Sequence, residues 1–282
     1  MTKKINLSKF NVCIAVNSLV YFLIAYYIVV FSFNLFSMVL ANWLGFDVEL
    51  FYYGYVWSGK EWTTDYTIIV FFVGNSLTLL FAVIFERLYR NQRKYAKGIK
   101  LLYLWIYLIG IMWFLGNVIV GSIFNFGIGA ALRAYRIPFF LRAILAAISV
   151  GVLLYLGFKA QKHVRVSANL YYQKLAKRAH RNFLLQQIVI PTIIGIIIII
   201  LLKIPYLGMY NYADVAVLLT MAFFVAGLFY KQNKWVSITF KNHGVKDTTH
   251  KSKNCNFSYF PMVIMFIVLA IVRIGLMDGL AF

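Results

Sequence analysis

Hydrophobic and polar positions alternate along this chain in long blocks rather than residue by residue. A helix that crosses a lipid bilayer needs about 20 consecutive, mostly apolar residues. Seven runs approach or exceed this length, at residues 11–40, 66–85, 101–124, 138–158, 184–204, 213–230 and 259–277. The pattern therefore predicts an all-α polytopic membrane protein with about seven transmembrane helices, forming a single integral membrane domain over residues 1–282.

Two segments between these runs carry a pattern of their own. Residues 46–57 are aromatic and β-branched with partial alternation, which predicts a short hairpin or interfacial strand after the first helix. Residues 160–183 mix Lys, Arg and His with Val, Leu and Tyr. That mixture fits an interfacial amphipathic helix, and it fits equally well a solvated extension of the fourth helix.

Composition agrees with a lipid environment. The 282 residues are 62% hydrophobic and 13% charged, with a mean hydropathy of +0.79. A soluble domain carries about 25% charged residues. At half that density the chain cannot cover a water-facing surface, so most of its surface is expected to contact lipid.

The basic residues divide the connecting segments into two classes. Lysines and arginines gather in residues 3–9, 87–100, 159–181 and 231–253, whereas the segment after the first run is acidic. Cytoplasmic segments of membrane proteins carry the excess of Lys and Arg. Seven crossings therefore predict a cytoplasmic N-terminus and an extracytoplasmic C-terminus, and we expect a bacterial inner (cytoplasmic) membrane.

The net charge of +20 bears on the partners. Because the basic residues lie between apolar runs and form no compact face with base-reading side chains, nucleic acid is not expected as a partner. Basic loops beside a membrane attract anionic lipid headgroups. We therefore expect membrane lipids as partners, with a second membrane protein as a further candidate.

Candidate chemistry begins at the end of the first run, with Phe33-Asn34-Leu35-Phe36-Ser37 followed by Ala41, Gly45 and Gly54. This segment resembles the signature helix of the site-2 protease family of intramembrane zinc metalloproteases. That family carries H-E-x-x-H, in which two His four residues apart bind zinc and the Glu is the base. In this chain Phe33 and Ser37 stand at the His positions, and Asn34 stands at the Glu position.

Two further patches follow in the order that the resemblance implies. Gly74 and Asn75 resemble the Gly-Pro entry into the next core helix, with Asn75 in place of Pro. Asn117 and Asn125 resemble an Asn-x-x-Pro…Asp-Gly-Gly segment, with Asn125 in place of the zinc-binding Asp. The resemblance covers about residues 25–135 and leaves residues 136–282 as additional helices. A chance match among residues that recur in membrane helices is the alternative.

The departures from the family pattern determine the expected chemistry. A catalytic zinc needs three protein ligands and an open position, and neither Phe33, Ser37 nor Asn125 is a good ligand. Asn34 cannot accept a proton as Glu would. The chain is therefore predicted to be no enzyme, with no catalytic residue, no metal and no cofactor.

The remaining polar residues of the runs admit two explanations. Polar side chains within a membrane are functional candidates by default, but interhelical hydrogen bonds explain them as well. We expect the set to line a vestigial or ligand-binding site made of Phe33, Asn34, Ser37, Gly74, Asn75, Asn117 and Asn125. Arg142 is expected to snorkel, Asp214 to be interfacial, and Cys13 and Cys255 to form no structural disulfide.

Two functions remain open at this point. The first is a non-catalytic membrane protein, resembling an inactivated intramembrane metalloprotease, that binds a membrane segment, a lipid or a partner protein. The alternative is a transporter or channel-like membrane subunit whose Asn and Ser side chains line a pathway. No acidic residue is expected deep inside a run, which argues against proton-coupled transport.

Overall fold

The computed structural model describes residues 11–95, 97–177, 179–205, 209–230, 236–240 and 257–281. The basic residues at positions 3–9 and those in 231–253 all lie outside the described residues. Cys13 is disulfide-bonded, which corrects the expectation that the cysteines stay apart. Cys255 lies outside the described residues.

Among the described residues, five helices are long and apolar enough to cross a membrane. Two of them are the single elements α1 (Val12–Trp43) and α4 (Ile99–Phe124), and a third is α6 (Phe139–Ser167) with its final turn η2 (Ala168–Leu170). The fourth is a continuous helix made of α2 (Thr64–Ile68), η1 (Ile69–Val73) and α3 (Gly74–Gln92). The fifth is a continuous helix made of α7 (Ala179–Leu184), η3 (Leu185–Val189) and α8 (Ile190–Lys203). The prediction of a polytopic helical membrane protein is confirmed.

The two remaining predicted runs form shorter apolar helices. One is Tyr212–Leu228, which combines α9 (Met209–Leu219) and α10 (Met221–Leu228), and the other is α11 (Tyr259–Gly275). Both have fewer residues than the five long helices. The predicted seven crossings thus correspond to five long helices and two short ones within the described residues.

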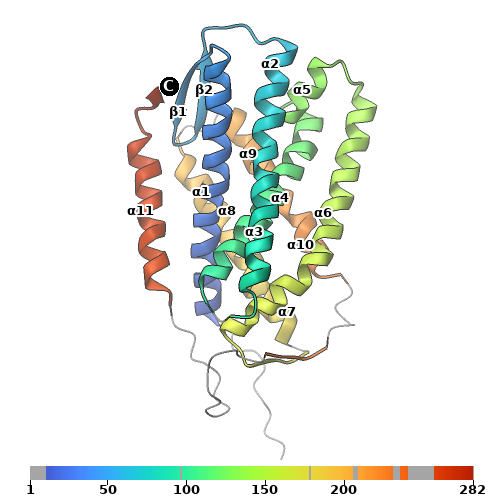
Figure 1. The fold of residues 1–282 in the computed structure, drawn as a ribbon, viewed down its shortest axis with the longest axis vertical. Helices are drawn as coiled ribbons and strands as arrows, with labels where there is room; N and C mark the ends of the chain where they lie inside the picture. The colour runs from blue at the N-terminus through green and yellow to red at the C-terminus, as the bar shows by residue number, and fades with distance from the viewer. Residues whose placement is uncertain are drawn as a thin grey trace, which may run out of the picture.

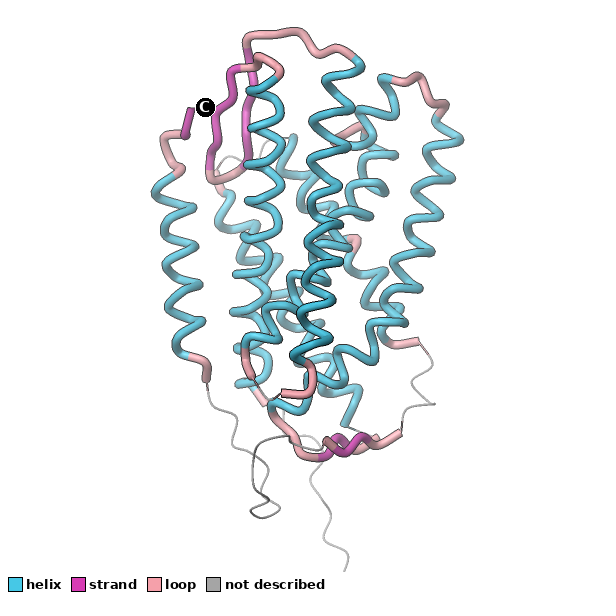
Figure 2. The backbone as a smooth tube through the Cα atoms, in the orientation of Figure 1, coloured by secondary structure: helices cyan, strands magenta, loops and turns pink. Residues whose placement is uncertain are grey.

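Strands occur at both ends of the bundle (Figure 2). β1 (Asp47–Phe51) and β2 (Gly54–Ser58) form the predicted hairpin after α1, and β5 (Leu280–Ala281) pairs with the other edge of β1. At the opposite end, β3 (Lys174–Leu175) pairs with β4 (Ile238–Thr239). We call the first the hairpin end and the second the basic end.

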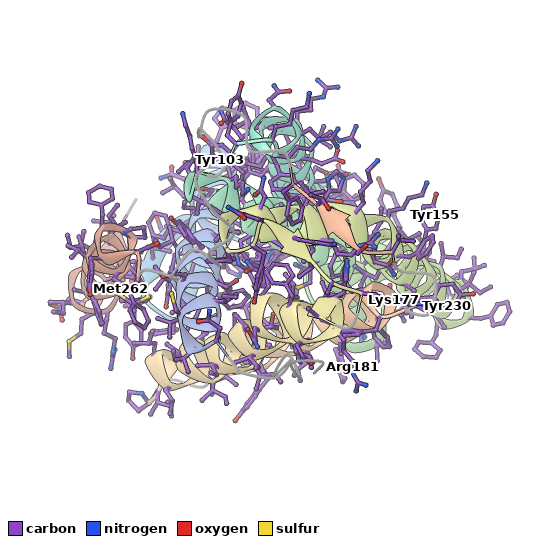
Figure 3. The ribbon with its side chains drawn as sticks, turned by 90° about the horizontal axis from the view of Figure 1, so that it is seen from below. Tyr103, Tyr155, Lys177, Arg181, Tyr230 and Met262 are labelled. Carbon is purple, nitrogen blue, oxygen red and sulfur yellow. The ribbon has the colours of Figure 1, made fainter. Side chains whose placement is uncertain are left out.

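The five long helices run alternately in opposite directions between these two ends (Figure 1). α4 lies centrally and packs against α1, α3, α6 and α9. Its buried rings Trp105 and Trp113 contact Phe22 and Tyr26 of α1 edge-on. α11 lies at the edge of the bundle in both views and has no buried residue (Figures 1 and 3).

The segment expected as either an interfacial helix or a helix extension is divided between several elements. α6 continues without a break to Ser167, so the extension is confirmed for residues 160–167. After η2 the chain forms β3 and then starts a new helix, α7, at Ala179. A single amphipathic helix over residues 160–183 is therefore wrong.

Candidate functional site

A cavity of about 800 Å³ opens at the hairpin end of the bundle. Its wall is built from α1, the hairpin, η1, the last turns of α4, the short helix α5 (Ile128–Ala134) and α9. Four of the residues predicted from the sequence line it, namely Phe33, Asn34, Asn117 and Asn125. We call this space the amide cavity, after its three asparagines.

The amide cavity reaches well below the end of α1. Asn34 lies nine residues before the last residue of α1, Trp43, which corresponds to about 13 Å along a helix axis. Tyr53 and Gly54, at the turn of the hairpin, line the same cavity as Asn34. The hairpin therefore folds back beside α1 toward the interior of the bundle, instead of lying flat over its end.

The other three predicted site residues lie behind the cavity wall. Gly74 of α3 faces Ser37 so closely that a Cβ added to Gly74 would lie 2.3 Å from Ser37 Oγ. Asn75 is buried, and its side-chain amide donates to the carbonyl oxygen of Phe114 at 3.3 Å. Ser37, Gly74 and Asn75 thus serve the packing between α1, α3 and α4 and do not line the cavity.

Asn117 and Asn125 reach the cavity from the last turns of α4. The Asn117 amide donates to the carbonyl oxygen of Trp113, one turn earlier, at 2.9 Å. Asn125 ends α4 in the left-handed conformation with φ of 63°, and its backbone N–H donates to Gly121 at 2.8 Å. Asparagine tolerates this conformation better than most residues because its short polar side chain bonds locally.

The side chain of Asn125 has a charged partner. Its Oδ1 accepts a hydrogen bond from Nη1 of Arg142 in α6. Arg142 is only 9% exposed, so it does not snorkel as the sequence led us to expect. Its Nε is buried without a hydrogen-bond partner. The carbonyl group of Asn125 is thus oriented by a buried guanidinium group.

A close backbone crossing holds α5 in the cavity wall. A Cβ added to Gly129 of α5 would lie 1.6 Å from the carbonyl oxygen of Gly121 in α4. Only two glycines permit this approach. Gly127, with φ of +50°, turns the chain between the two helices. The crossing places Ala130 and Arg133 at the cavity.

The aromatic part of the wall was not expected at this site. Five consecutive residues from the hairpin, Tyr53 to Trp57, line the cavity together with Trp62 and Phe71. Trp62 stacks on Phe71 with ring centroids 5.6 Å apart. The aromatic pattern of residues 46–57 was the available signal, but it indicates a membrane interface as readily as a cavity wall.

One ion pair stands beside the cavity. Asp214 of α9 lines the wall, and its carboxylate accepts from the Lys203 ammonium of α8 at 2.6 Å. Asp214 lies in the interior of α9 and not in its first turn, and its expected place at the membrane interface stays a prediction. Arg133, exposed on α5, contributes a positive charge to the wall.

Besides Arg133 and Asp214, the wall consists mainly of neutral amides, aromatic rings and small residues. Among the described residues, no group of three or more His, Cys, Asp or Glu side chains converges to hold a metal ion. His163 and His180 lie in α6 and α7 toward the basic end, and His243 and His250 fall outside the described residues. Asparagine side chains both donate and accept hydrogen bonds.

No protein-family model, curated protein or solved structure matches this chain. It is a polytopic helical membrane protein. The site must therefore be interpreted from its own geometry.

Proposed function

We propose that this protein is a non-catalytic membrane protein, distantly related to the site-2 proteases, that binds a short segment of another membrane protein in the amide cavity. One observation carries the proposal. Phe33 and Asn34 from the first sequence patch line the same cavity as Asn117 and Asn125 from the third. The proposed relationship to the site-2 proteases rests on this convergence and on the order of the motifs, because no family model, curated protein or solved structure supports it.

The size of the cavity limits what it accepts. One turn of an α-helix with its side chains occupies about 500 Å³, from a diameter of about 10–12 Å and a pitch of 5.4 Å. A cavity of about 800 Å³ is therefore of the size of a short stretch of polypeptide and not of a whole membrane-spanning helix. The occupant that we propose is an unwound segment of a few residues.

The lining suits an unwound polypeptide. A chain without helical hydrogen bonds exposes N–H and C=O groups, which are costly in a membrane unless the protein satisfies them. Asn34, Asn117 and Asn125 offer both donors and acceptors along the cavity. The hairpin residues from Tyr53 to Trp57 add an elongated aromatic surface that apolar side chains can contact.

Photo-crosslinking tests this proposal. A benzoylphenylalanine placed at Phe71, in the cavity, is expected to give a discrete protein adduct in cells. The same probe at Phe266, 65% exposed on α11, is expected to give lipid adducts. Ala130→Trp, which places an indole ring in the cavity, should reduce the Phe71 adduct at least about five-fold, since the segment loses part of its space.

A matched substitution controls for nonspecific effects of the bulky side chain. Ala147→Trp adds the same ring to an exposed position of α6 and should leave the Phe71 adduct unchanged. Lipid adducts at Phe71, or a protein adduct that persists in Ala130→Trp, would contradict the proposal. Stoichiometric zinc in the purified protein that is lost in Asn125→Ala would contradict its non-catalytic part.

A transporter or channel-like subunit is the second candidate, favoured by the Lys203–Asp214 pair. Charged side chains within membrane segments often mark a substrate or ion pathway, and Asp214 lines the cavity. Uptake of a solute or ion into proteoliposomes that is abolished by Asp214→Asn would support this function over segment binding.

A further inference from the structure

A second cavity, of about 470 Å³, lies toward the basic end between α3 and α6. Its lining comes from three helices and consists of Glu86, Arg90, Arg93, Tyr107, Tyr155, Leu156, Lys159, Lys162 and His163. The α3 residues follow one another at intervals of four and three, and Tyr155, Lys159 and Lys162 repeat this spacing in α6. Each set therefore lies on one helix face. We call this space the basic cavity.

The helix α4 lies between the two basic faces. It packs against both α3 and α6, and its buried Tyr107 lines the basic cavity. Tyr89 of α3 donates its hydroxyl hydrogen to the carbonyl oxygen of His163 in α6 at 2.6 Å. This bond ties the two faces together, so the cavity is a formed feature and not a gap between independent side chains.

The charges of the basic cavity are unbalanced. Glu86 is its one carboxylate, and Arg90 occupies that group with Nη2 and Nε at 2.6 and 3.0 Å from Oε1. Among the described residues, Arg93, Lys159 and Lys162 form no ion pair with a carboxylate. Three positive charges are thus left facing one small space.

A histidine side chain at the cavity also has an unpaired nitrogen. The His163 imidazole lies at the cavity with its Nε2 3.6 Å from Glu86 Oε1. Its Nδ1 is buried and has no hydrogen-bond partner. Buried polar atoms are nearly always hydrogen-bonded, so this nitrogen is a candidate partner for a bound group.

We propose that the basic cavity binds the phosphate-bearing headgroup of an anionic phospholipid. Phosphate oxygens accept charge-assisted hydrogen bonds from Arg and Lys, and basic pockets between transmembrane helices on the cytoplasmic side bind such headgroups. The apolar side chains of Leu79 and Val83 on α3 and of Ile148 and Val152 on α6 are exposed. They provide the lipid-facing surface along which the acyl chains extend.

Native mass spectrometry of the full chain in neutral detergent tests this site with three probes, namely phosphatidylglycerol, phosphatidylcholine and inorganic phosphate. Phosphatidylglycerol is expected to bind at least about ten-fold more tightly than phosphatidylcholine. Each of Arg93→Gln, Lys159→Gln and Lys162→Gln should weaken phosphatidylglycerol about five-fold, the effect typical of one basic residue at an anionic membrane surface. Inorganic phosphate at equal concentration should not displace the lipid.

Substitutions of other basic residues at the basic end distinguish lipid binding in the cavity from general attraction of anionic lipid to positive charge. Lys177→Gln and Arg181→Gln remove the same charge from exposed positions outside the cavity, and should change lipid affinity less than two-fold (Figure 3, which also labels Tyr155 of the cavity). Leu156→Trp narrows the cavity without changing charge and should weaken the lipid at least five-fold. Equal losses in the controls, displacement by free phosphate, or no preference over phosphatidylcholine would each overturn the proposal.

Discussion

A buried guanidinium group lies behind the amide cavity and bonds to one of its lining residues. Arg142 lies in an apolar helix, 9% exposed, and the side chain that accepts a hydrogen bond from it is that of Asn125. A buried charge is costly unless it is paired or well hydrogen-bonded. Asn125 also holds the left-handed conformation that ends α4, so one residue supports both a charge and a chain reversal.

Substitution of Asn125 separates these two roles. Asn125→Ala is expected to lower the free energy of unfolding by about 2–4 kcal/mol, with about 1–3 from the orphaned donor and about 1 from the backbone. Asn125→Gly should recover about 1 kcal/mol of this loss because glycine adopts positive φ freely. Unfolding in a detergent titration, followed by tryptophan fluorescence, measures both values.

The role of Arg142 is tested in the same assay. In an Arg142→Leu background no buried donor is orphaned, so Asn125→Gly should cost less than about 0.5 kcal/mol. Equal costs of Asn125→Gly in both backgrounds would show that the two side chains are not coupled.

At this scale four of the seven residues predicted from the sequence line one cavity, but their partners were not predicted. The asparagines Asn34, Asn117 and Asn125 were expected at one site and share one cavity wall. Arg142 and Asp214 were expected at the membrane interface because each lies near the end of an apolar run. Their partners, Asn125 and Lys203, come from other helices, and a single sequence does not specify such tertiary pairs.

At the scale of elements, close helix crossings depend on particular glycines. In α6, a Cβ added to Gly157 would lie 2.1 Å from the carbonyl oxygen of Phe224 in α10. The contact is reciprocal, because a Cβ on Gly227 would lie 2.1 Å from the carbonyl oxygen of Leu154. Small residues of this kind let membrane helices approach each other closely.

A second glycine of α6, Gly151, provides a control for the substitution of Gly157. Gly157→Ala is expected to lower the free energy of unfolding by about 1–3 kcal/mol, because backbone atoms cannot move aside as a side chain can. Gly151, with nothing within 4 Å of an added Cβ, is exposed. Gly151→Ala should change stability by less than about 1 kcal/mol in either direction. Similar effects of the two substitutions would refute the close crossing.

Element positions follow from the apolar runs, while element ends and pairings do not. The run expected at 213–230 corresponds to the helix Tyr212–Leu228, and that at 259–277 to Tyr259–Gly275. The fifth helix instead begins at Ala179, before its apolar run, because His180 and Arg181 continue the helix although they are polar. The pairing of β1 with β5 joins segments from opposite ends of the chain. The local pattern of hydrophobic residues does not predict such a long-range pairing.

At the scale of the whole molecule, the two proposed binding sites lie toward opposite ends of one bundle. The amide cavity is lined by the hairpin, whereas the basic cavity is lined by the last turns of α3 and α6. α4 contributes to both, with Asn117 and Asn125 near one end and Tyr107 closer to the other. If the basic end faces the cytoplasm, the lipid site lies in the inner leaflet and the amide cavity opens toward the outer face.

This orientation depends on whether the two short helices cross the membrane. α1 ends beside the hairpin, and α11 leads into β5, which pairs with β1 of that hairpin. Glu61 follows the hairpin, Tyr135 follows α5 and Asp278 precedes β5, so all three lie at the hairpin end. Lys94 follows α3 and Lys177 follows β3, so both lie at the basic end. α1 begins at the basic end and α11 ends at the hairpin end, so the number of helices that cross the membrane from α1 to α11 must be odd. Seven crossing helices meet this requirement.

Labelling of single cysteines tests the placement directly. In a background of Cys13→Ser and Cys255→Ser, a membrane-impermeant maleimide should label Glu61→Cys, Tyr135→Cys and Asp278→Cys in intact cells, because the positive-inside bias puts the hairpin end outside. Lys94→Cys and Lys177→Cys should react only after permeabilisation. If Asp278→Cys is protected while Glu61→Cys reacts, α11 does not cross; if the whole pattern is inverted, the basic end faces outward and the lipid site belongs to the outer leaflet.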